Sequence, residues 1–83
     1  MTGMIRLSKH AEEAVEKRDL DIDWIERTIS VADFARIDPH DPTLTRSFKS
    51  IAEAGRRILR VVHRPEGPDI LVVTAHFDRD AKP

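Results

Sequence analysis

Three side chains in the second half of the sequence have the chemistry needed to handle a phosphate group. Arg60 carries a permanent cation that could hold a phosphate, and His76 could donate or accept a proton near neutral pH. Glu53 is the nearest candidate for a carboxylate base. Each also has a plainer interpretation, in which His76 is a surface residue at a strand end and the charged residues form a solvated face.

Strand alternation decides whether Arg60 and His76 can act together, because successive side chains on a strand point to opposite faces. Two strands are predicted, at residues 56–64 and 70–77. On the first, Leu59 and Val61 face away from Arg60. The helix-packed face of the second is predicted to hold Leu71, Val73, Ala75 and Phe77. Its open face is predicted to hold Ile70, Val72, Thr74, His76 and Asp78. If Leu59 and Val61 belong to the core, Arg60 and His76 share the open face.

Basic residues are concentrated in one part of a chain whose net charge is only −1. That net charge argues against strong nonspecific binding to nucleic acid. Residues 43–64, however, contain six basic residues and one acid, whereas the segments on either side are acidic. Beside Arg60, the candidate phosphate-binding residues of this segment are Arg46, Lys49, Arg56, Arg57 and Arg64.

Two helices are predicted before the strands. Ser8 is a plausible N-cap for a helix at about 8–19. Asp21 or Asp23 begins a second helix that continues to about 33. Ile22, Ile25 and Ile29 form the apolar stripe of the second helix. Because only a few residues join the two helices, we expect a helical hairpin.

The rest of the chain predicts an antiparallel meander. A short strand at 34–37 precedes a proline-containing loop at 38–42, and strands follow at 44–52, 56–64 and 70–77. The segment 48–54 also fits a helix by propensity, and the tail from residue 78 is polar. The predicted fold is a single α+β domain spanning 1–83, with the helical hairpin on one face of a three- to four-stranded antiparallel sheet.

Several classes of function are disfavoured by composition. The chain has no cysteine, so thiol catalysis and cysteine-ligated metals are excluded. Its histidines, at positions 10, 40, 63 and 76, lack ligand spacing, and its glycines form no phosphate-binding loop. We therefore expect no metal and no cofactor. Without a long apolar run or a signal sequence, the expected location is the cytoplasm, away from any membrane.

Two stretches of the sequence carry a family resemblance. The first helix opens with Ser8-x-His10-Ala11 and closes with Arg18, and the later strands contain Gly55-Arg-Arg-Ile-Leu-Arg-Val-Val62 and Ile70-Leu-Val-Val-Thr74. Together with the order of elements, these stretches resemble a bacterial family of unknown function, number 4258, which is related to the RelE and BrnT toxins. The resemblance implies a RelE-like fold.

The resemblance also implies an RNA-directed role, either as an RNA-binding protein or as an endoribonuclease toxin. Its partners would be RNA or the ribosome and an antitoxin-like protein. Cleavage by a 2′-hydroxyl would use His76, Arg60 and Glu53. His10 and Arg18 are further candidate functional residues, but about 12 Å of helix separates them, too far for one tight site.

A second hypothesis is a non-enzymatic interaction or homodimerisation module. It draws support from the slightly acidic net charge and from the lack of tyrosine, a residue that some of the related toxins use at the active site. An exposed sheet edge could pair with another chain. This hypothesis predicts an apolar patch or a paired edge in place of a charged cleft.

Overall fold

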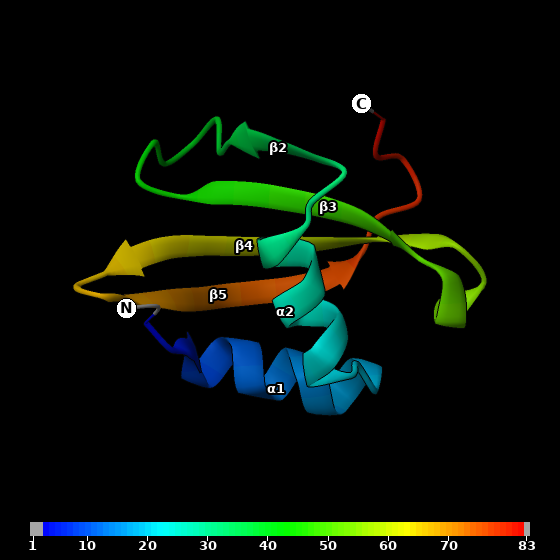
Figure 1. Ribbon diagram of the computed structural model, residues 1–83, viewed down its shortest axis with the longest axis horizontal. Coiled ribbons are helices and arrows are strands. Elements are labelled where there is room, and N and C mark those ends of the chain that lie inside the picture. The colour runs from blue at the N-terminus through cyan, green and yellow to red at the C-terminus, as the bar shows by residue number, and fades with distance from the viewer. Residues whose placement is uncertain (1–2, 83) are drawn as a thin grey trace.

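The computed structural model describes residues 3–82 as two helices packed on a five-stranded sheet (Figure 1). In chain order the elements are β1 (Ile5–Leu7), α1 (Lys9–Arg18), α2 (Ile22–Ser30), β2 (Phe34–Ile37), β3 (Thr45–Ile51), the 3₁₀ helix η1 (Ala52–Ala54), β4 (Arg57–Glu66) and β5 (Asp69–Phe77). The order of strands across the sheet is β1-β5-β4-β3-β2. The predicted α+β class is confirmed, with two helices ahead of most of the strands. The expected helical hairpin is not formed as such, because α1 packs mainly on β5 and α2 on β3 and β4.

Side-chain caps start both helices where they were predicted. The Ser8 hydroxyl accepts a hydrogen bond from the backbone N–H of Ala11 at 3.0 Å, and the Asp21 carboxylate accepts one from Asp23 at 2.9 Å. The second helix ends at Ser30, earlier than expected. It ends there because Asp33 is already bound to β3, donating its backbone N–H to the carbonyl of Phe48.

The sheet is mixed, so the prediction of a purely antiparallel sheet with three to four strands is wrong. Strand β1 runs parallel to β5, with Ile5 opposite Ile70 and Leu7 opposite Val72. Ser8 extends this pairing, since its backbone N–H donates to the carbonyl of Val72 at 2.9 Å. A three-residue strand is too short to show a periodic pattern, and its partner lies more than sixty residues away in the sequence.

Strands β2 to β5 form the predicted antiparallel meander. The helical alternative for residues 48–54 is right only for the last three, which form η1. After η1, Gly55 and Arg56 both adopt left-handed backbone conformations, with φ of 69° and 62°. These two residues turn the chain into β4.

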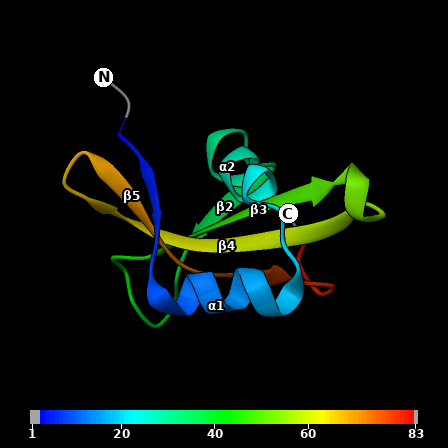
Figure 2. The same ribbon diagram turned by 90° about the horizontal axis from the view of Figure 1, so that it is seen from below.

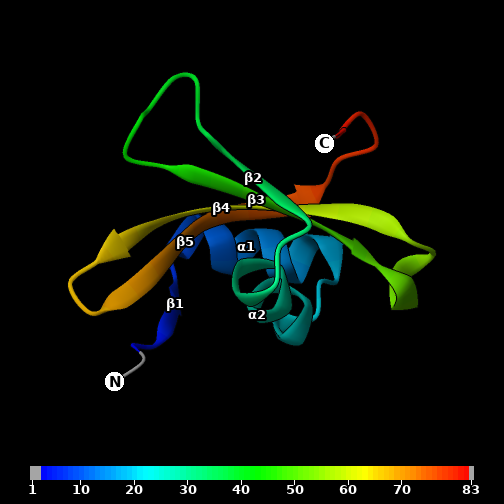
Figure 3. The same cartoon turned by 45° about the horizontal axis from the view of Figure 1, so that its top comes forward.

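Both helices lie on one side of the sheet, and the C-terminal segment lies on the other (Figure 3). Helix α1 packs mainly on β5, whereas α2 packs on β3 and β4. The core between the helices and the sheet consists of Ala11, Leu20, Ile25, Ile51, Leu59, Val61, Val72 and Ala75. None of the helices in residues 3–82 is long and apolar enough to cross a membrane.

A β-bulge corrects the predicted faces of the last strand. Val62 lies opposite Thr74 and His63 lies opposite Val72, so Val73 is left without a partner on β4. The extra residue reverses the alternation of side chains. Val72 is consequently fully buried in the core, and the predicted core positions Leu71 and Val73 lie outside it. Ala75 and Phe77, which follow the bulge, pack on the core as predicted.

Candidate functional site

Arg60 and His76 are direct neighbours on the open face of the sheet. They lie opposite each other on β4 and β5, and Nη2 of Arg60 lies 2.7 Å from Nε2 of His76. Since a guanidinium only donates hydrogen bonds, Nε2 must accept, and the ring proton is on Nδ1. The Arg60 guanidinium also lies 3.4 Å from the carboxylate of Asp78. The sequence-predicted placement of Arg60 and His76 on one face is therefore observed.

The environment of His76 favours a neutral ring. Partial burial lowers its pKa, and the cation of Arg60 lowers it further, while Asp78 opposes both effects. Arg60 is flanked on its other side by Phe48, whose ring stacks on Phe34 with centroids 4.6 Å apart. These neighbours hold Arg60 in place beside the imidazole.

A cleft of about 780 Å³ opens where β4 begins and β5 ends, and His76 lies in its wall. Its lining residues are Arg18, Arg56, Arg57, Ile58, His76, Phe77, Asp78 and Arg79. Helix α1 runs alongside β5 toward the end of that strand, as Figure 2 shows, and so brings Arg18 to the cleft. The tertiary structure thus gathers four arginines from three separate parts of the sequence.

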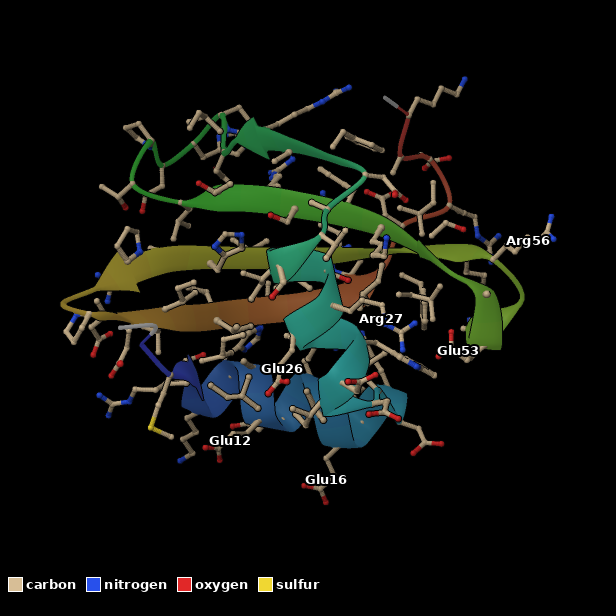
Figure 4. All side chains as sticks on the ribbon, in the orientation of Figure 1. Glu12, Glu16, Glu26, Arg27, Glu53 and Arg56 are labelled. Carbon is tan, nitrogen blue, oxygen red and sulfur yellow. The ribbon has the colours of Figure 1, made fainter. Side chains whose placement is uncertain are left out.

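Local structure positions two of these arginines. The Arg57 guanidinium lies over the ring of Phe77, with its central carbon 4.0 Å from the ring centroid, and its Nε donates to the carbonyl of Ala54. Arg56 occupies the left-handed turn and projects beyond the end of the sheet (Figure 4). A left-handed backbone at a residue other than glycine costs free energy and is often found at functional sites.

The four cleft arginines form no ion pairs with acidic side chains in the part of the chain that the structure describes. Within residues 3–82, none of Arg18, Arg56, Arg57 and Arg79 forms an ion pair, although Asp78 also lines the cleft. The cations that do form ion pairs in this part of the chain are Arg6, Arg27, Arg46, Lys49, Arg60 and Arg64. Lys9, Lys17, Arg36 and Lys82 also form no ion pair in this part of the chain, but they lie outside the cleft. Half of the unpaired cations of residues 3–82 therefore line one cleft.

The remaining predicted RNA-binding residues lie elsewhere and are ion-paired. Arg46 pairs with Asp38 at 3.0 Å, Lys49 with Asp33 at 3.5 Å and Arg64 with Glu66 at 3.9 Å. Lys49 shares a face of β3 with the buried Ser47 and Ile51, two residues to either side, whereas Phe48 lies opposite Arg60. Lys49 therefore lies on the side of the sheet opposite Arg60. The predicted basic cluster is thus divided, and only Arg56 and Arg57 of its five members reach the cleft.

Glu53 is held away from His76 by an ion pair that the sequence did not reveal. Both of its carboxylate oxygens accept hydrogen bonds from Arg27 of α2, at 3.0 and 2.9 Å (Figure 4). These bonds lower the pKa of Glu53 to about 2. Asp23 binds the same guanidinium at 2.7 Å. Glu53 is not among the cleft residues, and so strong an acid is a poor proton acceptor near neutral pH.

The two candidate functional residues on α1, His10 and Arg18, do not form one site, as expected from the length of helix between them. Arg18 lines the cleft, whereas His10, at the other end of α1, is exposed and is not part of it. Sequence reasoning missed Arg79 and the aromatic support from Phe77. The available signal was the position of Arg79 two residues after β5, at the same end of the hairpin as Arg56.

A second histidine, His63, forms a side-chain hydrogen bond away from the cleft. The Ser47 hydroxyl and Nε2 of His63 are 2.7 Å apart, and burial lowers the pKa of His63. Ser47 is only 4% exposed, which makes it inaccessible as a nucleophile. Among residues 3–82, no group of three or more histidine or acidic side chains is arranged to hold a metal ion.

Comparison with known proteins gives one match. No curated protein and no solved structure matches the chain significantly. A family model described as "Domain of unknown function (DUF4258)" matches residues 7–77. The matched region contains both helices, strands β2 to β5 and most of the residues that line the cleft. The chain therefore belongs to the DUF4258 family.

Proposed function

We propose that this protein binds RNA, with the cleft at the start of β4 and the end of β5 as the phosphate-binding site. The observation that carries the proposal is the convergence of Arg18, Arg56, Arg57 and Arg79, none of them ion-paired within residues 3–82. Contacts between such cations and phosphates supply most of the affinity of proteins for nucleic acid. Two helices packed on one face of a sheet support the proposed relationship to the RelE and BrnT toxins.

The arginines suit phosphate because a guanidinium offers planar pairs of N–H donors to two oxygens at once. Stacking on Phe77 and the bond to Ala54 restrict Arg57 and leave its terminal nitrogens available to a ligand. Less side-chain entropy is then lost when a phosphate binds. A lysine at position 57 would lose both the stacking and the paired donors.

The proposal is tested by fluorescence anisotropy with a single-stranded RNA of about 12 nucleotides, a length typical of single-strand binding sites. We expect binding at low salt that weakens as salt rises. Changing both Arg18 and Arg57 to Gln should reduce the slope of log affinity against log salt by about 0.7 for each lost phosphate contact. Changing Arg46 and Arg64 to Gln is the matched control, since both are ion-paired outside the cleft. No binding at low salt would reject RNA binding.

A second candidate, RNA cleavage, is favoured by the Arg60–His76 pair. The neutral imidazole of His76 would take the proton of a 2′-hydroxyl while Arg60 moves to the phosphate. The 2′-oxygen then bonds to phosphorus, the bond to the 5′-oxygen breaks, and that oxygen takes a proton from water. The products are a 2′,3′-cyclic phosphate and a 5′-hydroxyl.

Mass spectrometry of RNA incubated with the protein in a chelator tests cleavage separately from binding. We expect a fragment with a cyclic phosphate that is lost in His76→Gln and retained in His63→Gln, a histidine outside the cleft. If the RNA binds and remains intact with the unaltered protein, cleavage is rejected and binding is retained.

The homodimer hypothesis has one supporting feature, the outer edge of β2. This strand is at the end of the sheet, and Ile37 at its end is 62% exposed. An unpaired edge can add a strand from a second chain. Light scattering at high protein concentration decides the matter, because a mass equal to one chain would reject the dimer.

A further inference from the structure

Four arginines that form no ion pair within residues 3–82 line one cleft at one end of the sheet. We infer that the cleft recognises the terminal phosphomonoester of an RNA chain in preference to its internal phosphodiesters. This inference rests on the proposed RNA binding and narrows the class of ligand.

The first argument is charge density. Four guanidinium groups line a single cleft, and none of them is paired with an acid within residues 3–82. An internal phosphodiester carries one negative charge, whereas a phosphomonoester carries about 1.5–2 near neutral pH and has three strong acceptor oxygens. Several planar donors around one point are better satisfied by the second group.

The second argument is that the cations next to the cleft on the open face are already ion-paired. The two arginines that continue from the cleft toward β3 are each paired with an acid, Arg60 with Asp78 and Arg46 with Asp38. Asp78 itself lies in the wall of the cleft on this side. A phosphate that bound Arg60 or Arg46 would have to displace the carboxylate already there, so this face offers fewer free cations to a long strand than the cleft does. Arg36, farther away on β2, has no acidic partner within residues 3–82, but it donates to the carbonyl of Lys82 and lies over the ring of Phe34.

The helical side of the cleft is also unfavourable for a phosphate backbone. Arg18 ends α1, but the outer surface of that helix carries Glu12, Glu13 and Glu16, which are not ion-paired within residues 3–82. Figure 4 shows Glu12 and Glu16 directed away from the sheet. A strand that left the cleft along α1 would meet these carboxylates interspersed with Lys9 and Lys17, so the helix offers no continuous row of cations.

The third argument concerns the bases. Single-strand binders that track along RNA use exposed aromatic rings as stacking platforms. The aromatic ring of the cleft, Phe77, is already covered by the guanidinium of Arg57 and contacts Trp24, with ring centroids 6.2 Å apart. Phe34 and Phe48 on the open face stack on each other. These contacts leave the phosphate as the group that the cleft can recognise.

The experiment uses three RNAs of one sequence, with a 5′-phosphate, with a 3′-phosphate, and with hydroxyls at both ends. Each carries its fluorophore at the unmodified end or, for the third, at either end. One phosphorylated RNA should bind about tenfold more tightly than the hydroxyl form, as expected from one additional charge-assisted contact. The double variant Arg18→Gln with Arg56→Gly should bind the phosphorylated and hydroxyl RNAs equally. The variant with Arg46→Gln and Arg64→Gln should keep the preference.

The outcomes separate this inference from the proposed function. If none of the three RNAs binds, RNA binding itself fails. If all three bind with equal affinity, RNA binding stands and recognition of the end is overturned. Competition with inorganic phosphate and with adenosine monophosphate distinguishes the source of the phosphate. If either small molecule competes as well as the phosphorylated RNA, the ligand is a free phosphate compound and the inference is overturned.

Discussion

The substitution Arg56→Gly is predicted to stabilise the fold while weakening RNA binding. Arg56 has φ of 62°, a left-handed conformation that costs a residue with a Cβ roughly 1–2 kcal/mol relative to its usual conformations. Glycine adopts this conformation without strain. The contacts that hold the turn are formed by the backbone of Arg56, which donates to Ile51 and accepts from the hydroxyl of Ser50, and glycine retains both.

The expected gain in stability is the strain relieved minus the entropy that glycine adds to the unfolded chain. That entropy amounts to about 0.4–1 kcal/mol, which leaves a net gain of about 0.5–1 kcal/mol. For a domain of 60–100 residues, such a gain raises Tm by roughly 3–6 °C. Circular dichroism melts of the variant and the unaltered protein measure this difference.

The neighbouring glycine provides the matched control. Gly55 has φ of 69°, and a Cβ placed there would meet nothing within 4 Å. Gly55→Ala therefore introduces backbone strain without a clash and should lower stability by about 1 kcal/mol. In RNA binding, Arg56→Gly should lose about fivefold in affinity, which corresponds to ~1 kcal/mol for an exposed charged contact, whereas Gly55→Ala should retain its affinity.

Two results would refute this reasoning. A lower Tm for Arg56→Gly would show that the arginine side chain stabilises the turn by more than the backbone strain costs. A higher Tm with unchanged affinity for RNA would show that the left-handed arginine has no part in binding. Only the combination of gained stability and lost affinity fits a strained residue retained for its charge.

Three further predictions follow from the ion pairs and the bulge. The pKa of Glu53 is lowered from 4.5 to about 2, so its ion pair stabilises the fold above pH 4.5, and this stabilisation is lost as pH falls from 4.5 through 2. The free energy of unfolding of Glu53→Gln should therefore depend less on pH between 4.5 and 2 than that of the unaltered protein, as denaturation at several pH values would show. Asp78→Asn should lower the already depressed pKa of His76, as an NMR titration would show; an unchanged or raised pKa would contradict the assigned interaction. Val72→Ala should cost about 2 kcal/mol, well above the cost of Val73→Ala, in urea denaturation; equal losses would contradict the bulge.

The two helices and the antiparallel meander of β2 to β5 could be predicted because their signals are local. Ser8 and Asp21 cap helices through hydrogen bonds to residues two or three positions away, and the apolar periodicity of each element is readable in a short window. Strand β1 could not be predicted in this way. Its pairing with β5 is set by contacts between Ile5 and Ile70 and their neighbours, which are remote in sequence.

The candidate site was only partly predictable for the same reason. Alternation along two strands placed Arg60 beside His76, because the paired segments Leu59–Val62 and Thr74–Phe77 lie on one side of the bulge, where the predicted alternation holds. The predicted face of Val72 was wrong, because the unpaired Val73 at the bulge reverses the face on which each side chain beyond it lies. Glu53 was expected near His76 from its place before the hairpin, but the tertiary structure pairs it with Arg27 of α2.

The sequence by itself therefore determined the local elements, the lack of cysteine chemistry and the presence of a basic segment in an almost neutral chain. The tertiary structure decided which of those cations remain without an acidic partner. Arg46, Lys49 and Arg64 are ion-paired, while Arg56 and Arg57 meet Arg18 and Arg79 in one cleft. The physical reason is that electrostatic interaction depends on distance through space, which only the packing of helices and strands establishes.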